Sequence, residues 1–176
     1  MESPVPTLII TGPPGSGKST VATALHDALG ESGRANALVE VDELERVYPA
    51  LSQKRAMAHL RALCASYREL DLDLLIVTAT LEDDDDSDAV IAASGAHRHL
   101  IVRLEAAPET LSARILAREP ADWVGLTQLL ESASLLAEVM RHLTGVDLVL
   151  STDGSEPRHV ADQIRAKLEH EFSTAQ

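Results

Sequence analysis

Residues 12–20 read GPPGSGKST, and this stretch decides the fold. Its spacing, G-x-x-x-x-G-K-[ST], is met by Gly12, Gly17, Lys18 and Ser19, and is typical of a phosphate-binding loop. The apolar run Leu8 to Ile10 precedes it, and apolar residues at helical spacing follow, so the loop joins a strand to a helix. A chance glycine-rich turn is disfavoured, because strand, spacing and helix occur together.

Each residue type in the loop suits a polyphosphate ligand. Glycines lack a Cβ, so their backbone can turn successive N–H groups inward onto an anion. The helix that follows adds unpaired N–H groups and the positive end of its dipole. We therefore expect Lys18 to reach the β- and γ-phosphates of a nucleotide and the Ser19 hydroxyl to bind Mg²⁺. The predicted nucleotide-binding residues of the loop are Gly12, Pro13, Pro14, Gly15, Ser16, Gly17, Lys18, Ser19 and Thr20.

Composition narrows the class of protein. A length of 176 residues with 45% hydrophobic content predicts one domain, residues 1–176. A net charge of -13 disfavours nucleic acid and anionic membranes as partners, because each would repel the chain. The single cysteine, Cys64, permits no internal disulfide and is expected to be buried. Residues 1–7 lack the features of a signal peptide, and no apolar run approaches the ~20 residues of a membrane span. We therefore expect a cytoplasmic protein, either a monomer or a homodimer.

Apolar runs and helical periodicities alternate along the chain. Strands are predicted at residues 7–11, 37–41, 72–80, 99–104 and 146–151, and helices at residues 18–30, 42–50, 57–70, 87–94, 108–118, 126–143 and 160–168. The apolar stripe of the sixth helix, residues 126–143, is expected to belong to the core, and Leu116 to lie on the buried side of the fifth. This alternation predicts an α/β fold with a parallel sheet that binds ligands at the carboxyl ends of its strands.

Residues at two strand ends bear on the reaction. The third strand ends in Thr78, Ala79 and Thr80, so the aspartate usual in ATPases is missing there, and GTPase base-reading motifs are absent. The second strand leads into Asp42, and Arg46 follows four residues later, which suggests an acceptor site. Asp42 as a helix cap, and Arg46 as a surface partner of Asp42 or Glu43, are the alternatives.

The acidic run 83–86 admits two interpretations. It can hold a metal ion near the third strand, or it can be the solvated start of a helix, where acids are favoured by the dipole.

The chain resembles the small-molecule branch of the P-loop kinases, which includes shikimate, gluconate, adenylylsulfate and chloramphenicol kinases and nucleoside-kinase-like relatives. The resemblance runs through GPPGSGKST, VDELERVYP, RLEAAPETLSARILARE and STDGSEP, of which only the first is highly specific. It implies a P-loop NTPase fold, a three-layer α/β/α sandwich whose five parallel strands have the order 2-3-1-4-5, with a short lid around residues 118–125.

The resemblance also implies residue roles. Arg114 matches the arginine that stacks on adenine, and the loop from Asp153 to Pro157 is expected on the other side of the base. Arg118 matches the lid arginine that contacts the transferred phosphate, and Asp42 matches the aspartate that orients or deprotonates the acceptor hydroxyl. The chain departs from the pattern after Trp123, because no arginine follows until Arg141. Solvated positions on an exposed helix face are the alternative for Arg114 and Arg118.

The leading hypothesis is an ATP- and Mg²⁺-dependent kinase with a catalytic set of Lys18, Asp42 and Arg118. Its acceptor, bound by Asp42 and Arg46, is expected to be a small molecule that is neutral or weakly charged, because the chain offers few arginines for a phosphate ester. Two alternatives remain open: a regulatory nucleotide-binding protein without turnover, and a nucleoside monophosphate kinase.

Overall fold

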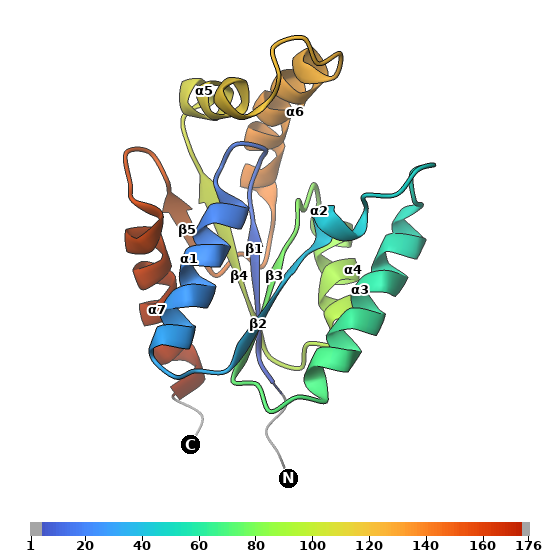
Figure 1. Cartoon of the computed structure of the whole chain (residues 1–176). Coiled ribbons are helices and arrows are strands. Elements are labelled where there is room, and N and C mark those ends of the chain that lie inside the picture. Colours follow the sequence, from blue (N-terminus) through green and yellow to red (C-terminus); the bar gives the residue numbers. More distant parts are fainter. Residues whose placement is uncertain (1–4, 174–176) are drawn as a thin grey trace.

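A five-stranded parallel sheet forms the centre of the protein (Figure 1). The computed structural model describes residues 5–173. The strands are β1 (Thr7–Thr11), β2 (Asn36–Glu40), β3 (Leu74–Thr78), β4 (His99–Glu105) and β5 (Leu148–Ser151), in the order β2-β3-β1-β4-β5. In the central register, Ile9 of β1 lies between Val77 of β3 and Ile101 of β4. The predicted sheet, its direction and its strand order are confirmed.

Helices cover both faces of the sheet. They are α1 (Lys18–Glu31), α2 (Val41–Leu44), α3 (Gln53–Arg68), α4 (Asp84–Ser94), α5 (Pro108–Arg118), α6 (Leu126–Val139), the 3₁₀ turn η1 (Met140–His142) and α7 (Pro157–Ser173). Helices α1 and α7 pack together on one face, and α3 and α4 pack together on the other, while α5 and α6 lie above the carboxyl edge (Figure 1). No helix within residues 5–173 has both the length and the apolar character needed to cross a membrane.

The hydrophobic core has two layers because the central strands are buried on both faces. Leu8 and Ile10 of β1 pack toward α1 and α7, whereas Ile9 packs with Leu60 of α3 and the layer beyond. Every residue of β1 and β3 is buried, as expected for central strands of a parallel sheet. Each large apolar side chain removed from water in this way contributes about 1.5–3 kcal/mol. The core thus holds the carboxyl ends of β1, β2 and β3 at one edge.

Three details of the sequence prediction are wrong. The second strand ends at Glu40 and the helix after it ends at Leu44, because the side chains of residues 45–50 stay exposed and no burial against the core stabilises a longer helix. Leu116 is exposed rather than buried. The apolar stripe of α6 is buried only at Ala133, and at Met140 of η1, while its leucines are half-buried or exposed. Helix α6 packs mainly on α5, at the rim of the sheet, which explains why its stripe meets so little core.

Candidate active site

The loop between β1 and α1 is shaped by glycines that no other residue can replace without strain. Gly12 and Gly15 have φ angles of 153° and 83°. A Cβ on Gly12 would lie 2.5 Å from the carbonyl oxygen of Leu104, and one on Gly15 would lie 2.7 Å from that of Leu111. The loop is therefore held tightly against β4 and α5, with the start of α1 at its end.

Lys18 is buried inside this loop. Its Nζ donates a 2.7 Å hydrogen bond to the carbonyl oxygen of Gly12 and a longer one, 3.5 Å, to that of Pro13. Burial lowers the pKa of Lys18 to about 8; the charge of Asp42 raises it, Arg118 lowers it and Glu40 raises it, in decreasing order of effect. A buried ammonium bonded only to carbonyl oxygens lacks a full counter-charge. The loop therefore fits an anion such as a phosphate, which would supply that charge.

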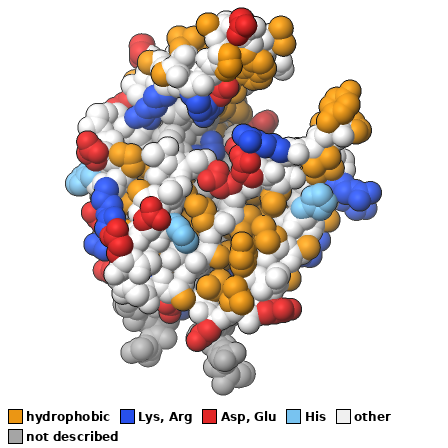
Figure 2. Space-filling model, viewed as in Figure 1, with side chains coloured by type: hydrophobic (Ala, Val, Ile, Leu, Met, Phe, Trp, Pro, Cys, Tyr) orange, Lys and Arg blue, Asp and Glu red, His pale blue; other side chains and the backbone are white. Residues whose placement is uncertain are grey.

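A cavity of about 380 Å³ lies against the loop, and we call it the phosphate-loop cavity. Figure 2 shows a hollow beneath the part of the molecule formed by α5 and α6. Five separate segments line the cavity, and its lining includes Lys18, Ser19, Asp42, Thr80, Arg114, Arg118 and Leu129. The structure thus brings together nine of the residues that the sequence predicted for the site, namely Pro14, Gly15, Gly17, Lys18, Ser19, Thr20, Asp42, Arg114 and Arg118.

Arg114 fastens α5 to two loops. Its guanidinium donates to the carbonyl oxygen of Gly15 at 3.1 Å, and to the hydroxyl and carbonyl oxygens of Thr152 at 2.8 and 2.7 Å. The Thr152 hydroxyl in turn donates to the carbonyl oxygen of Ser16 at 3.0 Å. Arg114 therefore holds the phosphate loop and the loop after β5 side by side. The Ser16 side-chain hydroxyl is the one buried side-chain polar atom in residues 5–173 without a hydrogen-bond partner.

The loop after β5 is fixed by Asp153 rather than opened toward the phosphate-loop cavity. Asp153 Oδ2 accepts a 2.9 Å hydrogen bond from the backbone N–H of Ala107. Hydrogen bonds from Thr110 and then from Ala107 lower the pKa of Asp153. Asp153 lines a smaller cavity of about 140 Å³ beside β4 and η1, and Pro157 begins α7. Neither residue lines the phosphate-loop cavity, so their predicted contact with a base stays a prediction.

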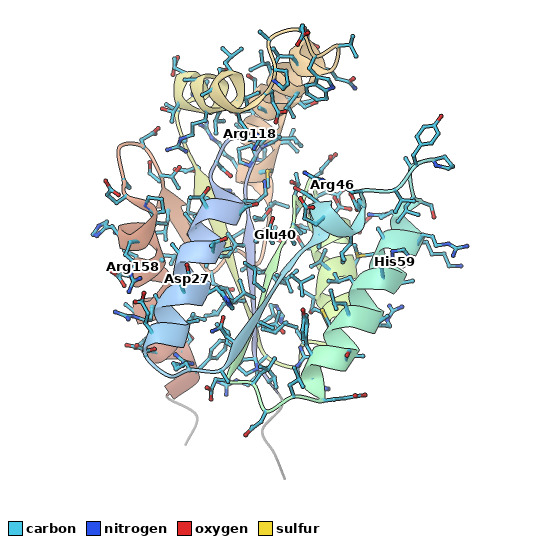
Figure 3. The ribbon with its side chains drawn as sticks, in the orientation of Figure 1. Asp27, Glu40, Arg46, His59, Arg118 and Arg158 are labelled. Atoms are coloured by element: carbon cyan, nitrogen blue, oxygen red, sulfur yellow. The ribbon has the colours of Figure 1, made fainter. Side chains whose placement is uncertain are left out.

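The two other arginines predicted for the site differ in position. Arg118 lines the phosphate-loop cavity, but its Nε donates a 2.6 Å hydrogen bond to Glu119. Arg46 is largely exposed and pairs with Glu43 at 3.2 Å, not with Asp42. Figure 3 shows Arg118 on the side of α5 and α6, and Arg46 beside α2. Arg46 lines neither the phosphate-loop cavity nor the neighbouring cavity between α2, α3 and α4, so the structure does not place it in the acceptor site.

Glu40, which the sequence analysis did not single out, belongs to the site. It is the last residue of β2, and its Oε2 accepts a 2.8 Å hydrogen bond from the Ser19 hydroxyl. A carboxylate and a hydroxyl are oxygen ligands of the kind that Mg²⁺ takes. Glu40 thus provides an acid close to Ser19, although β3 ends without one. The signal in the sequence that could have identified Glu40 is its place at the end of a predicted strand, two residues before Asp42.

A second cavity, of about 360 Å³, opens between α2, α3 and α4, and we call it the α3–α4 cavity. It shares Asp42 and Thr80 with the phosphate-loop cavity. Its walls are apolar at Val41, Met57 and Leu81 and acidic at Glu45 and Asp86. Asp42 therefore stands where the two cavities meet.

The acidic run has a structural role in its first and last members. Asp83 caps α4 and accepts a 2.9 Å hydrogen bond from the backbone N–H of Asp86. No group of three or more His, Cys, Asp or Glu side chains within residues 5–173 is arranged to hold a metal ion. These observations favour the interpretation of the run as a helix start.

A family of known proteins matches residues 8–138 of the chain, and its description is AAA domain. The chain belongs to the AAA domain family. This match includes the phosphate loop, Asp42, Arg114 and Arg118. No curated protein matches the sequence.

Several of the solved structures that are similar to this AAA domain protein are small-molecule kinases. A sugar kinase from Janibacter sp. HTCC2649 is 19% identical with a TM-score of 0.68, over 98% of this chain and 99% of its own. A gluconokinase from Sinorhizobium meliloti 1021 is 17% identical with a TM-score of 0.66, over 99% and 100%. The APS kinase of Mycobacterium tuberculosis, solved with AMPPNP and APS, is 21% identical with a TM-score of 0.60, over 96% and 99%. The predicted resemblance to the P-loop small-molecule kinases is thus confirmed at the level of the fold.

Proposed function

We propose that this protein is an ATP- and Mg²⁺-dependent kinase that transfers the γ-phosphoryl group to a hydroxyl of a small, neutral or weakly charged molecule. The observation that carries the proposal is the position of Asp42, at the junction of the phosphate-loop cavity and the α3–α4 cavity. A phosphoryl donor in the first cavity and an acceptor in the second would meet at this carboxylate. The proposal treats residues 1–176 as one kinase domain that works in the cytoplasm.

The phosphate loop would bind the donor. Lys18 would turn its ammonium from the carbonyl oxygens of the loop to the β- and γ-phosphates, whose negative charge would stabilise the charged form of the lysine. Ser19 and Glu40 would hold the metal ion, Glu40 directly or through the Ser19 hydroxyl that it now orients. A bound Mg²⁺ supplies neutralisation of the charge that develops on the phosphate oxygens.

Asp42 would act on the acceptor. In the transfer, the acceptor oxygen forms a bond to the γ-phosphorus while the bond from that phosphorus to the bridging oxygen of the leaving ADP breaks. The hydroxyl proton passes to the Asp42 carboxylate, which also orients the hydroxyl beforehand. Because phosphoryl transfer depends mostly on position and charge, this single carboxylate and the cations of the first cavity can suffice.

Arg114 and Arg118 have distinct proposed tasks. Arg114 is held by the Gly15 and Thr152 oxygens, so it fixes the frame on which a base would stack. Arg118 sits at the end of α5, beside the lid residues 118–125, and would leave Glu119 to contact the transferred phosphate when the lid closes. The kinases of similar fold support this assignment.

A regulatory nucleotide-binding protein without turnover is the second candidate. It is favoured by the end of β3, which lacks an acid, and by the pairing of Arg118 with the neighbouring Glu119. A nucleoside monophosphate kinase is less well supported, because no lysine or arginine within residues 5–173 lines the α3–α4 cavity, where an acceptor phosphate would lie.

Calorimetric titration with ATP and Mg²⁺, combined with an acceptor screen read by mass spectrometry, tests the proposal. The screen includes sugars, nucleosides, amino-alcohols and nucleoside monophosphates. A phosphorylated product from a non-phosphate acceptor is expected. Tight ATP binding with no product from any acceptor supports the regulatory candidate. Products from the monophosphates alone support a nucleoside monophosphate kinase.

A further inference from the structure

The α3–α4 cavity is strongly acidic. Four of its lining residues are carboxylates, namely Asp42, Glu45, Glu82 and Asp86, and the one amide is Gln53. Among the residues that the structure describes, neither lysine nor arginine lines it. Arg46, on the segment that follows α2, pairs with Glu43 outside the cavity. A ligand in this cavity therefore meets negative charge on several sides.

The charges of these carboxylates are only partly compensated. Asp86 accepts hydrogen bonds from the Gln53 side chain and, at 3.0 Å, from the backbone N–H of Glu82. In the part of the chain from residue 5 to residue 173, neither Asp42 nor Glu45 has a hydrogen bond or ion pair through its carboxylate. Loss of solvent, and then repulsion from Asp42 and Asp86, raise the pKa of Glu45. The carboxylates therefore lie close enough to repel one another, and a cation between them would relieve that repulsion.

The lining of the cavity suits an organic cation. The cavity has apolar walls at Val41, Met57, Leu81 and Val90, which suit a carbon skeleton. It shares Asp42 and Thr80 with the phosphate-loop cavity, so a ligand bound beside these residues would have its hydroxyl near the donor phosphate. A bare metal ion fits less well, because within the described residues the acids form no group that is arranged to ligate one.

We infer that the phosphoryl acceptor is an amino-alcohol, whose protonated amine lies among Glu45, Asp86 and the far side of Asp42 while its hydroxyl faces the phosphate-loop cavity. This inference rests on the proposed kinase function and names the class of its substrate. The ammonium would donate hydrogen bonds to Glu45 and Asp42, whose carboxylates lack donors among the described residues, and would add a charged donor to Asp86. A carboxylate-bearing or phosphate-bearing acceptor would be repelled by the same groups.

Two matched sets of compounds test the charge of the acceptor independently of its skeleton. One contains 2-deoxystreptamine, myo-inositol and quinate; the other contains 3-amino-1,2-propanediol, glycerol and glycerate. Binding of each compound is measured by calorimetry on the full chain with Mg²⁺ and AMPPNP. In at least one set, the ammonium compound is expected to bind about tenfold tighter than its neutral partner. This factor corresponds to the lower end of the free energies that hydrogen bonds to charged groups contribute. The carboxylate compound is expected to bind most weakly.

Two variants locate the effect. Glu45→Gln should remove most of the preference for the ammonium compound, whereas Glu43→Gln should retain it, because Glu43 lies on the same short segment but does not line the cavity. Equal binding of ammonium and neutral compounds in both sets, or no binding of any ammonium compound while AMPPNP still binds, overturns the inference. A preference that Glu45→Gln leaves unchanged overturns it as well.

Product formation with ATP separates this inference from the proposed function. Phosphorylation of inositol, glycerol or the acids as readily as of the amines supports the kinase and contradicts the amino-alcohol. Selective binding of the amines without a phosphorylated product, with ATP bound, supports the cationic ligand and contradicts the kinase.

Discussion

The hydroxyl of Ser19, in the first turn of α1, donates a 2.8 Å hydrogen bond to the carboxylate of Glu40, the last residue of β2. The two residues are 21 positions apart in the chain, and the parallel sheet brings them to one edge. Figure 3 labels Glu40 on the side of the sheet that faces α1 and α2. This pair places a negative charge beside the hydroxyl that the sequence predicts as a metal ligand.

Glu40→Gln is expected to weaken the dependence of nucleotide binding on Mg²⁺. The amide keeps the size of the side chain but loses the negative charge that would attract the metal ion. The apparent Mg²⁺ affinity should therefore fall about 10- to 100-fold. ATP binding without Mg²⁺ should change little. Calorimetric titrations of ATP at a series of Mg²⁺ concentrations measure both quantities, with Glu43→Gln as the control. An unchanged Mg²⁺ dependence would remove Glu40 from the metal site.

Lys18→Ala is expected to weaken binding of ATP far more than binding of ADP or adenosine, because the lysine is predicted to meet the outer phosphates. The fold should survive, since the side chain contacts only loop carbonyls. Calorimetry with the three ligands and a thermal melt of each variant check this, and the exposed Lys54→Ala provides the control. ATP binding equal to that of the parent protein would contradict the central assignment.

Binding of ATP above pH 8 is expected to take up a proton at Lys18. Its pKa is about 8 in the free protein, and the phosphates should raise it, so the amine is neutral when free and charged when bound. ATP affinity should therefore fall as pH rises above 8, by up to about tenfold per pH unit. Calorimetry at pH 9 in two buffers of different ionisation enthalpy measures the uptake. Lys18→Ala should abolish the proton uptake. Zero uptake by the parent protein would show that ATP binding does not protonate the lysine.

The same lysine affects the stability of the free protein. The unfolded chain binds a proton at Lys18 up to a pKa of 10.5, whereas the folded chain loses it near 8, so this residue makes the free energy of unfolding rise with pH between these values. Burial raises the pKa of Cys64 from 9.0 to about 11, which makes the free energy of unfolding fall with pH between those values. In denaturant titrations, the free energy of unfolding of Cys64→Ala should therefore rise more steeply with pH than that of the parent protein. The free energy of unfolding of Lys18→Ala should rise less steeply.

Asp42→Asn is expected to lower turnover by about 10²-fold or more, with little change in ATP affinity. Asparagine keeps the size of the side chain and its capping ability, so a loss of rate reports the loss of the proton acceptor. Initial rates with an acceptor that the parent protein phosphorylates, together with calorimetric ATP binding, give the measurement. Turnover equal to that of the parent protein would reduce Asp42 to a helix cap.

The lid around residues 118–125 is expected to become more ordered when nucleotide binds. Arg118 pairs with the neighbouring Glu119, and Val124 is almost fully exposed. Hydrogen exchange of this segment should slow with AMPPNP and Mg²⁺, while exchange in β1 stays unchanged. Equal exchange rates with and without nucleotide would contradict the movement of Arg118 to the phosphate.

The sequence by itself determined the features that depend on neighbouring residues. The glycine spacing of residues 12–20 predicts the loop, because its backbone angles and its hydrogen bonds to Lys18 are set within one turn of chain. The buried runs of β1 and β3 predict a parallel sheet, because a strand that is apolar on both sides must be covered on both faces. The strand order and the roles of Arg114 and Arg118 came from the resemblance to P-loop kinases rather than from the periodicity.

Tertiary structure alone decided which side chains share a site. Arg46 and Asp42 have the spacing of one helix face, but α2 ends at Leu44, so the spacing no longer applies and Arg46 pairs with Glu43. Glu40 and Ser19 meet only because β2 and the loop after β1 end at the same edge of the sheet, on either side of β3. The acidic α3–α4 cavity likewise gathers side chains from α2, α3 and α4. Contacts between distant segments depend on how the layers pack, and the local pattern of the chain does not encode them.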